Sequence, residues 1–154
     1  MKHMPDGYTT VTPYLTIKDA ARAIDHYRQA FGAVELSRLE DESGRIGWAE
    51  IEIGGSPIML SDEYAENDIL GPLSLGGSPV AIHLYVEDVD AVVAQAVATG
   101  AELLRPVADQ VFGVRNAILR DPFGHQWFIA TRTEDLTREQ MAERFKQLIG
   151  KSDG

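Results

Sequence analysis

The sequence contains no cysteine. This absence excludes a disulfide framework, a thiolate nucleophile and a thiolate metal site. No apolar run approaches the length needed to cross a bilayer, and residues 1–7 lack the apolar segment of a secretory signal. We therefore expect a cytoplasmic location, no membrane partner, and a short leader ahead of the first structured element.

Basic residues are also scarce, with 14 Lys and Arg against 24 Asp and Glu and a net charge of −10. Binding to a nucleic-acid backbone needs clustered Lys and Arg, so the balance argues against such a partner. A negative field instead concentrates positive solutes in a cleft, which favours a cationic small molecule.

Two copies of one βαβββ unit follow each other in the sequence. In the first, residues 9–17 alternate in character and predict a strand, and Asp19 is placed to cap a helix that ends at Gly32. Further strands are predicted at 34–39, 47–53 and 57–61. The same order returns with a strand at 80–86, a helix between Asp88 and Gly100, and strands at 102–106, 115–119 and 126–130.

These patterns predict one α+β domain over residues 8–132, with modules at 8–62 and 79–132. Residues 63–78 are rich in Glu, Asp, Gly, Pro and Ser, and predict a loop between the modules. Apolar residues at helical spacing over 136–149 predict an appended helix within residues 133–150. It is expected to dock on the body or on a second subunit.

Two segments resemble the vicinal oxygen chelate superfamily of glyoxalases, bleomycin-resistance proteins and dioxygenases. Its final hairpin is similar to LRDPFGHQW at 119–127, and the start of its second module is similar to HLYVEDVD at 83–90. The resemblance implies that the paired modules form a curved mixed sheet around a cleft, with helices on the outer face. It also implies a homodimer, because family members commonly form one.

Enzymes of that superfamily hold a divalent metal with one side chain from the first and one from the last strand of each module. Carried onto this sequence, the four positions are Thr12, Met59, Ala81 and Phe128. Methyl, thioether and phenyl groups do not supply the oxygen or imidazole ligands that such metals need. We therefore expect no metal and no cofactor, and we do not expect the metal-dependent activities of the family.

Strand alternation predicts which side chains line the cleft, because one sheet face is aliphatic and packs under the helices. The predicted ligand-binding residues are Tyr14, Trp48, Glu50, Met59, His83, Tyr85, Phe112, Arg115 and Phe128. Aromatic rings beside a carboxylate suit a flat or cationic compound. The parity at Arg115 leaves two options open: it reaches an anionic group at the cleft mouth, or it pairs with a surface acid. His125 faces away from the cleft and is interpreted as structural.

The leading hypothesis is a metal-independent binding protein of the bleomycin-resistance type. It would confer antibiotic resistance by sequestering an aromatic or cationic compound without changing it. The alternative is a glyoxalase-like isomerase or lyase that uses His83 as base with Glu50 or Arg115 as its partner, or a shifted metal site at His83 with Glu50 or Glu52. A ligand-sensing or scaffold module is a third possibility.

Overall fold

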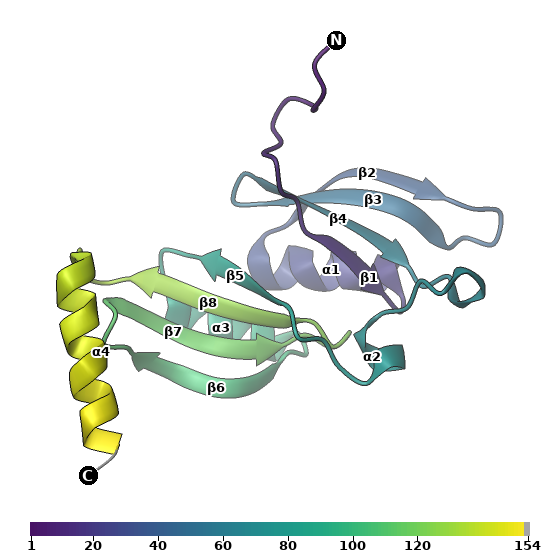
Figure 1. Ribbon diagram of the computed structural model, residues 1–154. Helices are drawn as coiled ribbons and strands as arrows, with labels where there is room; N and C mark the ends of the chain where they lie inside the picture. Colours follow the sequence, from purple (N-terminus) through teal and green to yellow (C-terminus); the bar gives the residue numbers. More distant parts are fainter. Residues whose placement is uncertain (153–154) are drawn as a thin grey trace.

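The computed structural model describes residues 1–152 and contains the two predicted βαβββ modules in tandem (Figure 1). The first module consists of β1 (Tyr14–Ile17), α1 (Ala20–Phe31), β2 (Val34–Glu40), β3 (Ile46–Ile53) and β4 (Ser56–Asp62). The second consists of β5 (Ala81–Tyr85), α3 (Val89–Ala98), β6 (Glu102–Asp109), β7 (Val114–Arg120) and β8 (Gln126–Arg132). The 3-10 turn η1 (Ala65–Asn67) and the short helix α2 (Pro72–Leu75) lie between them, and α4 (Arg138–Ser152) follows.

Each module forms its own four-stranded sheet with the same strand order. The orders are β1-β4-β3-β2, hereafter sheet 1, and β5-β8-β7-β6, hereafter sheet 2. The first strand of each sheet runs parallel to its neighbour, and the other pairings are antiparallel. The predicted α+β fold is confirmed, with the strands divided between two mixed sheets rather than joined in one curved sheet.

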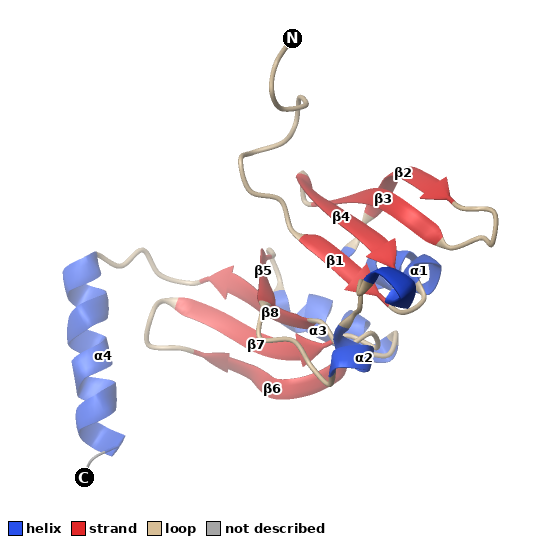
Figure 2. Cartoon of the chain, turned by 45° about the vertical axis from the view of Figure 1, so that its right-hand side comes forward, coloured by secondary structure: helices blue, strands red, loops and turns tan. Residues whose placement is uncertain are grey.

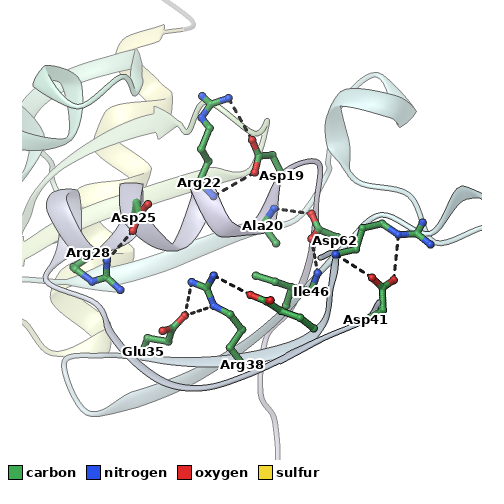
Figure 3. A network of polar contacts seen from close by, with 12 residues as sticks. Asp19, Ala20, Arg22, Asp25, Arg28, Glu35, Arg38, Asp41, Ile46 and Asp62 are labelled. Atoms are coloured by element: carbon green, nitrogen blue, oxygen red, sulfur yellow. Dashed lines mark hydrogen bonds and ion pairs between the residues drawn. The ribbon is translucent and has the colours of Figure 1, made fainter. Parts of the chain in front are cut away.

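The start of the first helix is fixed by two acidic side chains. Asp19 adopts a left-handed backbone conformation with φ 73°, and its carboxylate accepts a hydrogen bond from the backbone N–H of Arg22. The carboxylate of Asp62, at the end of β4, accepts from the N–H of Ala20 at 2.8 Å and from the N–H of Ile46 at 2.7 Å (Figure 3). Asp62 therefore ties the helix start to β3 and β4, because it accepts from a donor that the helix leaves unpaired, the N–H of Ala20, and from the first N–H of β3.

The strand predicted from residue 9 begins only at Tyr14. Residues 9–12 alternate as a strand does, but none of their backbone N–H groups donates a hydrogen bond within the described chain. The pairing with β4 reaches back only to the carbonyl of Pro13, which accepts from the N–H of Met59. Alternation predicts a strand correctly only where a neighbouring strand is present to bond with it.

The two modules share one hydrophobic core. It combines the helix-covered faces of both sheets with α1 and α3, which pack against each other. At the junction, the buried carboxylate of Asp121 accepts hydrogen bonds from the Tyr27 hydroxyl of the first module at 2.6 Å and from Trp127 Nε1 at 2.9 Å. Because each sheet buries its helix-covered face in this shared core, the opposite face of each sheet is left open.

Helix α4 stands at the end of sheet 2, and sheet 2 lies between α4 and sheet 1 in both views (Figures 1 and 2). Its predicted range is close to the observed one. Among residues 1–152, no helix is long and apolar enough to span a membrane.

Candidate functional site

The open face of sheet 1 brings four of the predicted ligand-binding residues together. Tyr14 of β1 lies opposite Met59 of β4, and Met59 lies opposite Glu50 of β3. Trp48 lies two residues before Glu50 on the same strand, and side chains two apart in a strand point to the same face. These residues form one continuous surface, hereafter half-site 1.

Half-site 1 contains two carboxylates without partners. Within residues 1–152, neither Glu50 nor Glu52 makes a hydrogen bond or an ion pair, and both side chains are partly buried. The rim of the same face is apolar, with Val34 57% exposed and Leu39 61% exposed. A partly desolvated, unpaired carboxylate beside aromatic rings gains most from a cation.

The open face of sheet 2 holds a second group of predicted residues, hereafter half-site 2. His83 lies opposite Phe128 in the sheet register, and Phe128 lies opposite Ile118. The His83 ring centroid is 4.6 Å from that of Tyr85 and 6.4 Å from that of Phe128. The His83 side chain is exposed, and its ring nitrogens have no hydrogen-bond partner among the described residues.

The structure does not bring the two half-sites together within one chain. His83 and Tyr85 line a groove of about 470 Å³ between β5, the β3–β4 turn and residues 7–13. Tyr14 lines another of about 270 Å³, formed with the loop between the modules. Neither groove contains Trp48, Glu50, Met59 or Phe128. The predicted cleft residues are therefore divided between two faces that the shared core separates.

Phe112 and Arg115 belong to neither half-site. Phe112 packs against Phe145 of α4, with ring centroids 6.0 Å apart. Arg115 has the same strand parity as the buried Ala117, so it points to the helix-covered face. There its Nε donates to Asp90 at 2.8 Å, which lowers the pKa of that carboxyl. The sequence left two options open for Arg115, and the structure shows the second: Arg115 pairs with a surface acid, Asp90.

Several residues on these surfaces were missed by sequence analysis. Asn116 and Ile118 belong to half-site 2, and the alternation with buried Ala117 and Leu119 would have placed them there. The junction of Tyr27 with Asp121 carried no such signal, because its partners lie 94 residues apart in the sequence. His125, which the sequence placed away from the cleft, is buried with its Nε2 3.0 Å from the carbonyl oxygen of Thr16, and it lines the same groove as Tyr14.

Residues 7–129 match the sequence profile of the Glyoxalase/Bleomycin resistance protein/Dioxygenase superfamily. The chain belongs to this superfamily. The uncharacterized protein Mb0911c of Mycobacterium bovis is 38% identical over 134 residues, which cover 85% of this chain and 88% of that protein. TioX from Micromonospora sp. ML1 is similar in structure, with a TM-score of 0.61 and 26% identity over 84% of this chain and all of TioX.

The fosfomycin resistance protein FosX of Listeria monocytogenes shares the superfamily fold with this chain. Its TM-score is 0.63, with 20% identity over 90% of this chain and 99% of FosX. At this identity the likeness establishes the fold alone.

The metal ligands implied by the superfamily do not fit the residues present. Met59 and Phe128 lie on the open sheet faces, Ala81 lies at the start of β5, and Thr12 precedes β1. Their thioether, phenyl, methyl and hydroxyl groups do not make a divalent-metal site. Residues 1–152 also contain no group of three or more His, Asp or Glu side chains placed to hold a metal ion. His83 with Glu50 or Glu52 forms no such group within these residues either.

Proposed function

We propose that the protein is a metal-independent binding protein of the bleomycin-resistance type, which sequesters a cationic aromatic compound without chemical change. One observation carries the proposal. The positions of the superfamily's metal ligands hold groups that do not bind metals, while the same faces present aromatic rings and unpaired carboxylates.

Half-site 1 has the chemistry for the cationic part of such a compound. The faces of Trp48 and Tyr14 offer negative quadrupoles, and Glu50 offers a full negative charge that nothing else in the described chain neutralises. The thioether of Met59, in register between Tyr14 and Glu50, adapts to irregular ligand shapes. The net charge of −10 draws cations toward the protein.

A homodimer would complete the site, and this is part of the proposal. Each half-site is one wall, and a small-molecule pocket needs walls on more than one side to bury most of its ligand. In a twofold dimer, half-site 1 of one protomer would face half-site 2 of its partner, which creates two equivalent pockets.

The binding test uses the fluorescence of Trp48. The sequence has two tryptophans, and Trp127 is fully buried, so a quencher bound at half-site 1 acts on Trp48. We expect benzyltrimethylammonium to quench the wild-type protein in a saturable way, and its neutral isostere neopentylbenzene to bind at least tenfold more weakly. Glu50→Gln should weaken binding of the cation by about tenfold, or 1.4 kcal/mol, and leave binding of the neutral compound unchanged.

Trp48→Phe is the matched control, because it keeps an aromatic ring on the face but should abolish the fluorescence response. Equal affinities for the charged and neutral compounds would contradict the proposed recognition of a cation. Binding that persists unchanged in Glu50→Gln would remove half-site 1 from the proposal.

The enzymatic alternative lacks a supporting contact. A general base needs a partner that fixes its tautomer and orientation, and the exposed ring of His83 has none among the described residues. If a bound compound is converted to product and His83→Ala abolishes the conversion while retaining binding, the protein is an enzyme and sequestration is wrong.

A further inference from the structure

Helix α4 contacts earlier parts of its own chain through Phe145 and Arg144. Phe145 packs on Phe112, and the Arg144 guanidinium donates to Glu134 at 2.6 Å and to the carbonyl of Val111 at 3.3 Å. The helix is 15 residues long and lies outside the segment that matches the superfamily. A helix of this length is marginal in water unless its apolar side is covered.

The surface of α4 is divided between an apolar, basic side and an acidic side. At 3.6 residues per turn, Met141, Phe145 and Leu148 share one side, with Arg138 and Lys151 flanking them. Glu139 and Glu143 fall on the opposite side. Phe145 remains 47% exposed and Leu148 remains 46% exposed. We call the side with Met141, Phe145 and Leu148 the α4 stripe.

The charge of α4 is opposite to that of the remaining chain. It has four basic and two acidic residues, a net charge of +2, which leaves −12 for the rest of the sequence. Within residues 1–152, neither Arg138 nor Lys151 makes an ion pair. An apolar stripe flanked by unpaired cations is complementary to an apolar surface that carries unpaired carboxylates.

Half-site 1 and its rim are such a surface. Within residues 1–152, Glu52 has no partner and lies opposite Val34 in the sheet register, and Val34 and Leu39 are exposed on the same face. The helix cannot reach this face in its own chain, because sheet 2 lies between them (Figures 1 and 2). Only a second copy can bring the α4 stripe and sheet 1 together.

We infer that the α4 stripe of one protomer docks on the rim of half-site 1 of a second copy, over β2 and the neighbouring part of β3, and so closes the outer side of the partner's ligand pocket. This inference rests on the proposed dimeric binding site and assigns α4 a role in it. In a twofold dimer, each protomer gives one helix and receives one.

Cysteine cross-linking tests the contact directly, because the native sequence has no cysteine. Full-length Leu39→Cys and Met141→Cys proteins are prepared separately, mixed, and treated with a short bis-maleimide. A covalent dimer in the mixture, but not in either protein alone, is the expected result. Glu139→Cys replaces Met141→Cys in the matched control, because Glu139 lies on the opposite side of the same helix. Equal cross-linking from positions 139 and 141, or none from either, would overturn the inference.

Charge reversal gives a second, independent measurement by sedimentation equilibrium. Arg138→Glu and Glu52→Lys should each raise the dimer dissociation constant about threefold, and the double variant should restore it. Phe145→Asp should raise it about tenfold in the full-length chain. No effect of Phe145→Asp, or effects of the two charge reversals that add rather than cancel, would contradict the docking of α4.

The outcomes separate this inference from the proposed function. Cross-linking from position 141 without saturable quenching by benzyltrimethylammonium would keep the α4 contact and reject the ligand. Quenching without cross-linking would keep the ligand and reject the α4 contact.

Discussion

Replacing Asp121 with alanine tests whether this carboxylate holds the two modules together. Asp121 is 3% exposed and accepts four hydrogen bonds: from the Tyr27 hydroxyl, from Trp127 Nε1, and from the backbone N–H groups of Phe123 and His125. Alanine would leave the hydroxyl and the indole N–H buried without an acceptor, and each such group costs about 1–3 kcal/mol. The two turn N–H groups also lose their acceptor. We expect Asp121→Ala to lower the free energy of unfolding by about 4–6 kcal/mol.

This loss approaches the whole stability of a typical domain, which is about 5–15 kcal/mol. The assay is urea unfolding followed by tryptophan fluorescence, for which the buried Trp127 is a reporter. Tyr27→Phe is the matched control, because it removes one hydrogen bond and leaves the other three acceptor contacts intact. It should cost about 2 kcal/mol. A loss below about 2 kcal/mol for Asp121→Ala would refute the reasoning, because it would mean that water or a rearranged turn satisfies the orphaned donors.

Three further predictions use the same unfolding assay. Burial lowers the pKa of His26 below its usual 6.5, so the unfolded chain binds a proton at this residue more readily than the folded chain does. The free energy of unfolding should therefore fall as the pH drops below 6.5. His26→Gln should flatten this dependence on pH. Asp62→Ala removes the acceptor of two backbone N–H groups and should cost about 2 kcal/mol, whereas Asp62→Asn, which keeps one acceptor oxygen, should cost less. Arg115→Ala should cost under about 1 kcal/mol and leave binding of benzyltrimethylammonium unchanged, because its ion pair with Asp90 is solvent-screened and lies outside both half-sites; a tenfold loss of affinity would contradict this placement.

The sequence predicted the modules and the inward and outward faces of their strands. Periodicity sufficed because each strand has one buried face, which fixes the parity of Leu15 and Ile51 on one side and of Tyr14 and Glu50 on the other. Periodicity did not decide the direction of the side chain of Arg115, at one end of a predicted strand. Arg115 lies at the start of its strand, next to a loop, and its partner Asp90 is on a helix that no local pattern connects to it.

Periodicity did not predict how the two modules pack against each other. A pattern shows which face of a sheet is apolar, but it does not show which other face will cover it. Which face covers which depends on contacts between residues distant in sequence. An example is the contact of Phe31 with Trp127, whose ring centroids are 4.6 Å apart. This is why seven of the nine residues predicted for one cleft lie on the open sheet faces and yet belong to two separate half-sites, while Phe112 and Arg115 belong to neither.

Each sheet that buries one face must leave the other to solvent, to a ligand or to another chain. Here the open faces do not have the character of solvated surfaces, because Tyr14 and Tyr85 are more than half exposed and lie in register with Met59 and Ala130. The α4 stripe adds a third apolar surface, flanked by cations, to an acidic chain. Three unrelated partners are not needed to cover them, because the proposed twofold contact between copies would pair sheet 1 with sheet 2 and would place α4 on the rim of half-site 1. One association would then account for the exposed rings and for the half-exposed apolar side chains of α4, and a protein that is monomeric at micromolar concentration would leave both without an explanation.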